Sequence, residues 1–452
     1  MKKSLFAVAA LTAIAGAAQA QSSVTVYGIL DMGYIGSNAK EVAAPTAANA
    51  GSSVPNQQTT KVQKSGFGNG AEQTSRLGFK GTEDLGGGTS AFFTVELGLT
   101  PQNSELSGGT AKDAIQNNTN ASGSAVDNRQ SFVGLKKNGL GQAAFGRQYT
   151  PLFNAGAATD PGQYNNIAGN VIYNSGSVYG SADTLTSGTN NNIGFTNRAS
   201  NALTFNSDKF SGFGLNGMYA LNNQNQTVLT NSSAGGGNTN WNGWGLSADF
   251  TWQKLYLTAA YQSFKTSYTS NIYGAVNGTA VNLNSAGVTA PQLTAAGNIF
   301  SAPAQISDKQ TYVGATYDFG ILKAYAQWIG RKVQNDTTSS ATLGLSNTTS
   351  AVVAGQQFNR NAQQIGVRSY ITPAIEAWGS VGTGKYTGPI AAAGLPASVN
   401  ILAWQLGSNY YLSKRTNLYA IYGQQQSTAS GVSTAGSGSS ANQYALGLRH
   451  TF

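Results

Sequence analysis

The stretch VTVYGILDMGY, residues 24–34, changes character at every second position. Its even positions carry valine, glycine, leucine, methionine and tyrosine, whereas its odd positions carry threonine, tyrosine, isoleucine, aspartate and glycine. Successive side chains of a β-strand point to opposite faces of the sheet. The stretch therefore predicts a strand with one apolar face and one wetter face.

The same alternation recurs in sixteen runs along the chain. They lie near residues 24–35, 73–82, 89–99, 127–136, 141–150, 198–206, 213–220, 243–252, 255–264, 309–318, 321–331, 361–371, 374–386, 401–412, 415–425 and 441–452. Short turns such as 253–254 and 319–320 are interleaved with long loops rich in Asn, Ser, Thr, Gly and Ala. An even number of strands with short turns at one end and long loops at the other is typical of outer-membrane barrels. We predict an all-β fold, a 16-stranded antiparallel transmembrane β-barrel.

A closed barrel also satisfies the physics of a bilayer. Backbone groups in lipid must be paired internally, and a closed barrel leaves no open edge. Sixteen strands enclose a lumen too wide for wall side chains alone to fill. Residues 151–197 read as loop throughout, and a loop of that length inside a compact domain requires a function. We predict that this segment folds inward and narrows a pore.

The N-terminus has the layout of a secretory signal peptide. Lys2 and Lys3 precede an apolar run that ends at Ala18-Gln19-Ala20, so residues 1–20 are predicted to be removed. The loss of two lysines lowers the formal net charge from +9 to +7, and residues 21–452 form the predicted single barrel domain. Cysteine is absent from the sequence, so neither disulfides nor thiol chemistry are available.

A soluble secreted β-protein, such as a surface adhesin with its polar loops as the binding surface, would show similar alternation. Three features count against it. The short turns are interleaved with long loops over the whole chain, the apolar faces carry Trp, Tyr, Phe and Leu as lipid contact requires, and the chain ends on a strand at Phe452. The adhesin stays the alternative from another class of protein.

Five motifs in order resemble the general porins of Gram-negative bacteria, especially those of β-proteobacteria. They are SVTVYG at 23–28, SRLGFKGTEDLG at 75–86, RQSFVGL at 129–135, GRQY at 146–149 and YALGLRHTF at 444–452. The resemblance implies a homotrimer of sixteen-stranded barrels in the outer membrane, each with its third extracellular loop folded into the lumen. It also implies partners in the outer-membrane lipid and lipopolysaccharide, and no nucleic-acid partner.

The resemblance further implies a pore constriction with a basic and an acidic side. The family's ladder of arginines matches Arg76, Arg129 and Arg198, and its loop acids match Asp160 and, less well, Asp183. This chain departs from the enterobacterial members because its loop is acid-poor and lacks their acid-Phe-Gly-Gly signature. Arginine remains charged at any relevant pH, so the three side chains would set a field across the lumen. In the alternative interpretation they only attach the loop to the wall.

Other charged residues on the wetter faces are candidates for lumen charges that tune selectivity, namely Asp31, Lys80 and Glu96. The terminal aromatic strand that ends at Phe452 resembles the signal recognised by the barrel assembly machinery. The same residue also fits the end of an ordinary lipid-facing strand, and the two interpretations are compatible.

Enzymatic function is not expected. The sequence holds one histidine, His450, on the predicted lipid-facing side, and it offers neither a nucleophile–base pair nor a His/Cys metal cluster. No cofactor is expected. The predicted function is passive diffusion of ions and small hydrophilic solutes through an outer-membrane channel, with a preference for anions. A substrate-specific porin is the alternative within the channel class.

Overall fold

The computed structural model describes residues 23–42, 59–102, 106–107, 126–173, 194–230, 233–271, 273–276, 279–282, 304–336, 341–342, 351–352, 357–390, 396–430 and 438–452. The predicted signal peptide and Asp183 lie outside these residues. No described helix is long and apolar enough to cross a bilayer.

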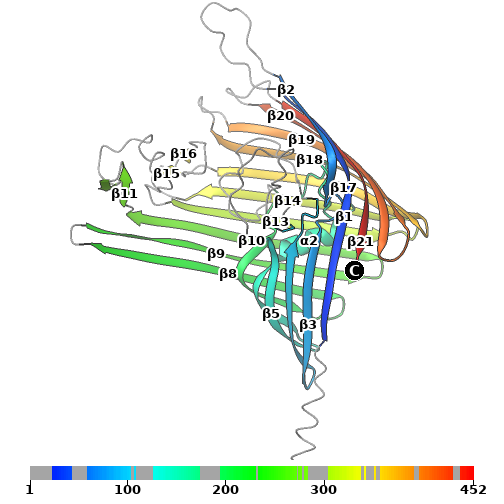
Figure 1. Cartoon of the computed structure of the whole chain (residues 1–452), viewed down its shortest axis with the longest axis horizontal. Helices are drawn as coiled ribbons and strands as arrows, with labels where there is room; N and C mark the ends of the chain where they lie inside the picture. The colour runs from blue at the N-terminus through cyan, green and yellow to red at the C-terminus, as the bar shows by residue number, and fades with distance from the viewer. Residues whose placement is uncertain are drawn as a thin grey trace, which may run out of the picture.

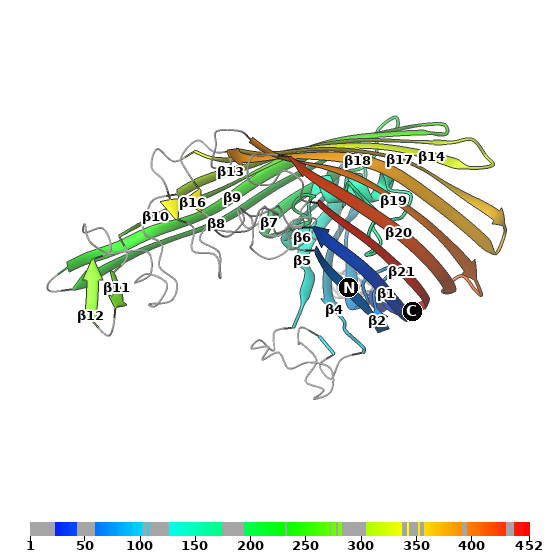
Figure 2. The same ribbon diagram turned by 90° about the horizontal axis from the view of Figure 1, so that it is seen from above.

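The described strands form one antiparallel wall that closes on itself (Figures 1 and 2). The wall strands are β1 (Ser23–Val42), β2 (Thr59–Asn69), β3 (Arg76–Gly86), β4 (Thr89–Gly98), β5 (Asn128–Lys137), β6 (Gly141–Tyr149), β7 (Arg198–Ser207), β8 (Phe213–Thr230), β9 (Ser233–Trp252), β10 (Leu255–Asn271), β13 (Ala304–Asp318), β14 (Lys323–Asn335), β17 (Gln357–Thr372), β18 (Ile375–Ile390), β19 (Pro396–Tyr411), β20 (Thr416–Ser430) and β21 (Gly438–Thr451). Two small hairpins, β11 (Tyr273–Val276) with β12 (Thr279–Asn282) and β15 (Ala341–Thr342) with β16 (Ala351–Val352), lie between wall strands in the chain.

The wall has the sixteen strand positions that the sequence predicts, because β2 and β3 share one position beside β1. β1 pairs with β3 up to Ile29 and with β2 from Met32 onward. Between the two partners, Ser75 and Gly70 take over the hydrogen bonds of Asp31: its N–H donates to the Ser75 hydroxyl at 3.0 Å and its carbonyl accepts from Gly70 N–H at 2.9 Å. The interruption therefore leaves the main-chain N–H and carbonyl of Asp31 paired.

The barrel closes between its first and last strands. β21 pairs with β1 in a continuous register from Ile29 opposite Thr451 to Val42 opposite Gly438. Beyond that register, Gly28 and Phe452 exchange backbone hydrogen bonds of 3.1 and 3.2 Å. The wall consequently has no free edge at this seam, as a barrel in lipid requires.

The two faces of the wall differ as the alternation predicts. Outward positions expose large apolar side chains, among them Leu246, Leu257, Val313, Ile365 and Leu406. Inward positions carry buried polar side chains, among them Gln262, Gln310, Gln327, Gln364 and Gln405. An outward apolar face with a polar interior is what a barrel in lipid needs.

Residues 151–197 were predicted to be loop throughout, and for the first part of this segment, directly after β6, the prediction is wrong. Pro151–Thr159 forms helix α2. Thr150 caps it by accepting from Phe153 N–H at 3.2 Å, and proline is well suited to the first helical position because its N–H would be unpaired there anyway. This Thr-Pro start signal was overlooked, although Leu152 and three alanines that follow it favour a helix.

Candidate functional site: the basic wall and the inner segment

Arg76, Arg129 and Arg198 come together on the inside of the wall, from β3, β5 and β7. The Arg129 guanidinium donates to Glu96 Oε1 at 2.8 Å and to the Tyr149 hydroxyl at 2.7 Å. Arg198 lies over the Tyr149 ring, 5.2 Å from its centroid. Arg76 Nη1 lies 3.9 Å from Glu96 Oε1. We call these three arginines with Glu96 and Tyr149 the basic cluster.

A β-bulge brings Arg129 to the inside. Leu97 pairs with Asn128 and Glu96 with Gln130, so Arg129 is the extra residue of β5. Further along β5, Val133 is 60% exposed and faces outward, and by strict alternation Arg129 would share its face. The bulge reverses this, and Arg129 is 5% exposed. Alternation alone could not have assigned its direction.

Glu96 is the carboxylate of the basic cluster and is buried at 3% exposure. It bridges Arg129 and Arg76 and accepts from the Tyr27 hydroxyl at 3.2 Å. Its single negative charge leaves an excess of two positive charges over the three arginines. Lys80 lies at 5.4 Å over the Tyr27 ring, on the same face of β3 as Arg76, and extends the positive side.

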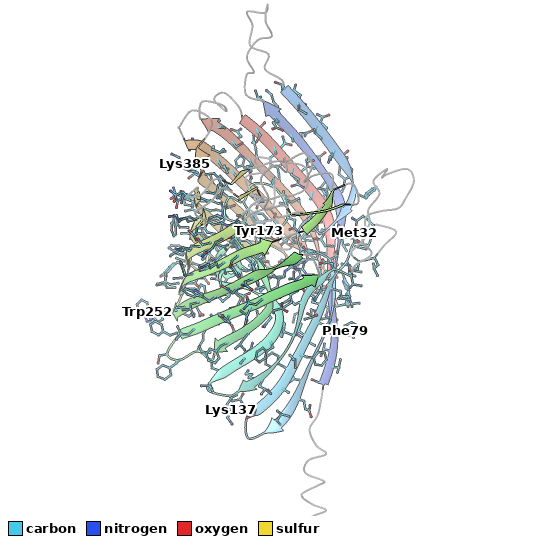
Figure 3. All side chains as sticks on the ribbon, turned by 90° about the vertical axis from the view of Figure 1, so that its left-hand side faces the viewer. Met32, Phe79, Lys137, Tyr173, Trp252 and Lys385 are labelled. Atoms are coloured by element: carbon cyan, nitrogen blue, oxygen red, sulfur yellow. The ribbon has the colours of Figure 1, made fainter. Side chains whose placement is uncertain are left out.

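The inner segment, residues 151–197, is described at 151–173 and 194–197, and both parts share a buried apolar cluster with inward side chains of the wall. Figure 1 shows α2 on the inner side of the wall. Helix α2 lies against β9, β10 and β13. At its end the Thr159 hydroxyl is 2.5 Å from the Tyr312 hydroxyl, and the Thr159 carbonyl accepts from Gln327 at 2.7 Å. Figure 3 shows Tyr173 between the two ends of the wall. That the whole of 151–197 folds inward stays a prediction, because residues 174–193 lie outside the described residues.

Asp160 lies where α2 ends and is buried at 2% exposure. Its carboxylate accepts hydrogen bonds from Tyr164 N–H at 2.8 Å, Asn170 at 2.8 Å, Gln364 at 3.0 Å and Gln327 at 3.2 Å. Burial raises the pKa of the Asp160 carboxyl, and the four donors oppose that shift by stabilising the ionised form. These contacts favour a structural role, in which Asp160 holds the segment against β14 and β17. They do not favour direct contact of its carboxylate with solutes in the lumen.

Two further side chains attach the segment to the far wall. Arg360 of β17 is 1% exposed and donates to the carbonyls of Val171, Ile172 (3.1 Å) and Gly194 (2.9 Å). Gln405 of β19 donates to the carbonyl of Ala168 at 2.8 Å. Alternation places both residues on the inward face, but it cannot show which main-chain carbonyls they meet.

The segment also contacts the interruption between β2 and β3. Asn166 N–H donates to the Ala71 carbonyl at 3.0 Å, and its side-chain amide donates to the Gly70 carbonyl at 2.6 Å. Asp31 is fully buried next to this contact, where it accepts from Gln73 N–H at 2.7 Å and from the Tyr419 hydroxyl at 2.5 Å. Asp31 was predicted to be a lumen charge. Its contacts favour a role in holding residues 70–75, and its effect on ions stays a prediction.

Phe452, the predicted assembly signal, lies at the seam between β1 and β21. It is 40% exposed, and its ring lies where a side chain on Gly28 would stand. His450 of the same strand is 2.9 Å from the Thr416 hydroxyl through Nδ1. Within the described residues, no group of three or more His, Cys, Asp and Glu side chains could hold a metal ion.

Comparison with known proteins identifies the family. The Gram-negative porin family matches residues 7–430. The chain belongs to the Gram-negative porin family. It is 28% identical over 470 residues to an outer membrane porin protein of Bordetella pertussis, covering 100% of both chains. It is 32% identical over 237 residues to outer membrane porin protein 32 of Delftia acidovorans, covering 52% of this chain and 54% of that protein.

The fold matches solved porins as well. The anion-selective porin from Comamonas acidovorans superimposes with a TM-score of 0.57 at 22% identity, over 96% of this chain and 100% of that one. This porin is thus an outer-membrane β-barrel channel, as the sequence predicts.

Proposed function

We propose that the porin conducts small hydrophilic solutes by passive diffusion and favours anions. The observation that supports this proposal is the basic cluster, which contains three inward guanidinium groups and only one carboxylate. The Asp160 carboxylate is buried beneath hydrogen-bond donors, so it is not available for direct contact with a passing cation. A lumen with excess fixed positive charge raises the local concentration of anions and lowers that of cations. The anion-selective porin with the same fold supports this direction.

The constriction would lie between the basic cluster and the inner segment. Residues 151–173 are fixed to β13, β14, β17 and β19 by the contacts of Thr159, Asp160 and Asn165. These strands lie across the ring from β3, β5 and β7 in strand order. Solutes would pass between the two sides without an energy source, so neither a catalytic group nor a cofactor is required.

The family resemblance supports a homotrimer that is exported after removal of residues 1–20. A trimer in the outer membrane should migrate as an SDS-resistant species that dissociates on heating. Sequencing the N-terminus of the exported protein should give Gln21. Migration as a monomer under mild conditions, or a start at Met1, would contradict these two parts of the proposal.

Selectivity measurements test the proposed function. In a planar bilayer under a salt gradient, we expect stepwise conductance with a reversal potential that favours anions. Arg76→Ala combined with Arg198→Ala should shift the reversal potential toward cations by several-fold in permeability ratio, because two of the three fixed charges are lost. Lys414→Ala, an exposed change in the turn before β20, is the matched control and should leave the ratio unchanged. An unchanged reversal potential in the double variant would contradict the role of the basic cluster.

A further inference from the structure

A cavity of about 480 Å³ lies on the inner side of the wall near the short turns. It is lined by Ala158 near the end of α2, by the turn at 253–254 and by the adjoining ends of β9, β10, β13 and β14. In the family's orientation the short turns face the periplasm, so we call this cavity the periplasmic pocket. No member of the basic cluster lines it, and its volume falls within the range of small-molecule sites, about 300–1,000 Å³.

Thr316 of β13 lines the pocket and is buried at 2% exposure. Across the sheet it pairs with Tyr256 of β10 on one side and with Tyr325 of β14 on the other. Its hydroxyl has no hydrogen-bond partner among the residues that the structure describes. Buried polar groups in proteins are nearly always hydrogen-bonded, so an unpaired hydroxyl beside a cavity points to a partner that enters the cavity.

Three charged side chains, Lys254, Asp318 and Lys323, also line the pocket. The backbone holds them close together, because Asp318 N–H donates to the Lys254 carbonyl at 3.0 Å and Asp318 is the direct partner of Lys323 across β13 and β14. Within the described part of the chain, no ion pair joins Asp318 to either lysine, and neither ammonium group forms a hydrogen bond. The Lys323 ammonium lies 5.3 Å over the Tyr325 ring, a contact that leaves N–H groups able to donate. The pocket thus combines two positive charges and one negative charge that are not paired with one another.

Charged side chains beside the pocket are paired, in contrast. Arg368, the partner of Lys323 across β14 and β17, binds Glu376 at 2.5 Å. Lys209 binds Asp249 of β9 at 2.9 Å. These two ion pairs compensate their own charges, so the excess of one positive charge belongs to the pocket itself. A bound solute with one net negative charge would balance it.

We propose that the periplasmic pocket binds acidic α-amino acids. At neutral pH such a solute carries two carboxylates and one ammonium group, which match the two lysines and Asp318 charge for charge. A dicarboxylate without the ammonium group would leave Asp318 unpaired, and a neutral amino acid would leave one lysine unpaired. The Thr316 hydroxyl can donate to a carboxylate oxygen of the solute. The inference rests on the proposed function in one respect only, namely that the solute reaches the pocket through an open lumen.

Equilibrium titration of the purified porin in detergent micelles with L-glutamate tests the proposal without requiring conduction. Binding is followed by saturation-transfer NMR of the solute, and we expect saturable binding that L-aspartate displaces. Glutarate lacks the ammonium group and L-glutamine lacks the second carboxylate. Each should bind roughly tenfold more weakly, because one hydrogen bond between charged groups is lost. Equal binding of L-glutamate and either analogue would overturn the assignment to acidic amino acids.

Asp318→Asn separates recognition of the solute from folding of the turn. Asp318 accepts from Gly320 N–H at 2.7 Å, and the asparagine oxygen can still accept this hydrogen bond. The variant should bind L-glutamate roughly tenfold more weakly and glutarate more tightly, because the charge that attracts ammonium and repels carboxylate is removed. A merely structural role of Asp318 would weaken the binding of both solutes alike, and that result would overturn its assigned role.

A second set of variants tests the lysines. Lys254→Gln combined with Lys323→Gln should weaken L-glutamate binding by roughly tenfold or more, because both positive charges are lost. Lys254→Arg combined with Lys323→Arg should retain most of the binding, since the charges remain. Lys414→Gln, an exposed change at the short turn before β20, is the matched control and should bind L-glutamate like the unmodified porin. Unchanged binding in the double glutamine variant would overturn the site.

The reversal potential of the unmodified porin and of each variant is recorded in parallel. Anion-favouring conductance without binding of L-glutamate would reject the pocket and leave the proposed function standing. Binding of L-glutamate by a porin that does not conduct would support the pocket and reject the proposed function. The failure of one is therefore distinguishable from the failure of the other.

Discussion

At the scale of single residues, the bulged Arg129 compensates the buried Glu96, and its contribution of charge to the lumen stays a prediction. Arg129→Ala removes the 2.8 Å partner of Glu96 and leaves Arg76 at 3.9 Å. Removing one partner of a buried ion pair costs about 3–5 kcal/mol. We therefore expect Arg129→Ala to lower the free energy of unfolding by about 3 kcal/mol, measured by urea titration of the barrel in detergent.

The matched control for this residue is Arg76→Ala, which is the more exposed arginine of the two. Its effect on unfolding should be smaller, whereas its effect on selectivity should be similar. The double variant Arg129→Ala with Glu96→Ala should recover part of the lost stability, since the buried charge is then absent. No recovery in the double variant would show that Arg129 stabilises the wall in some other way.

Gly28 allows the barrel to close around Phe452. A Cβ at Gly28 would lie 2.3 Å from the Phe452 ring and 2.7 Å from the Arg76 carbonyl, closer than atoms pack. Gly28→Val should therefore hinder pairing of β1 with β21 at this end, and we expect a smaller folded fraction in the heat-modifiability assay on gels. Gly66→Val is the control, because nothing lies within 4 Å of a Cβ there. Equal folded fractions in both variants would contradict a role for Gly28 in closure.

At the scale of elements, the inner segment is held by side chains from strands that lie far apart in the wall. Arg360 donates to the carbonyls of Val171, Ile172 and Gly194. A hydrogen bond from a charged group contributes about 1.5–3 kcal/mol to stability. Arg360→Gln shortens the side chain and loses most of these bonds. We expect noisier open-channel current and a lower unfolding temperature by several degrees, recorded in bilayers and by circular dichroism.

Gln363→Ala provides the comparison for that change. Gln363 is an exposed, outward residue of the same strand, so its removal should affect neither the current noise nor the unfolding temperature. Quiet current in Arg360→Gln would mean that the remaining contacts of Asp160 and Gln405 fix the segment on their own.

The sequence predicted the wall well because its signal is local. Alternation depends only on which face contacts lipid, and the runs near 89–99 and 255–264 correspond to β4 and β10. Alternation could not predict features that depend on parts of the chain far away in sequence. The bulge at Arg129 depends on the partner strand, β2 is recognised only by its register with β1, and the burial of Asp160 depends on Gln327 and Gln364.

The candidate site was predictable in part from the family resemblance. The resemblance named Arg76, Arg129 and Arg198, and the structure brings them together with Glu96. Their effect on ions stays a prediction. Asp160 has the right position in the chain for a lumen acid, yet four donors of the wall and the segment bury it. Whether a carboxylate faces the lumen depends on side-chain packing across the barrel, which sequence spacing does not encode.

At the scale of the whole molecule, selectivity should respond to salt but hardly to pH. The Debye length falls from about 10 Å at 0.1 M to about 3 Å at 1 M, so fixed charges act over less of the lumen at high salt. We expect the anion-to-cation permeability ratio to decrease several-fold over this range. Between pH 5 and 9 the ratio should stay nearly constant, because guanidinium groups remain protonated. A steep loss near neutral pH would show that some other group controls selectivity.

The seam between β1 and β21 makes the barrel a ring of strands whose first and last members are ordinary neighbours. Ile29 faces Thr451 in the same register as any pair within the wall. A circular permutant that joins Ser23 to Phe452 by a short linker and opens the chain within a long connection should therefore keep every wall pairing. If it refolds in detergent but fails to reach the outer membrane in cells, the terminal position of Phe452 serves recognition during assembly and not the stability of the finished barrel.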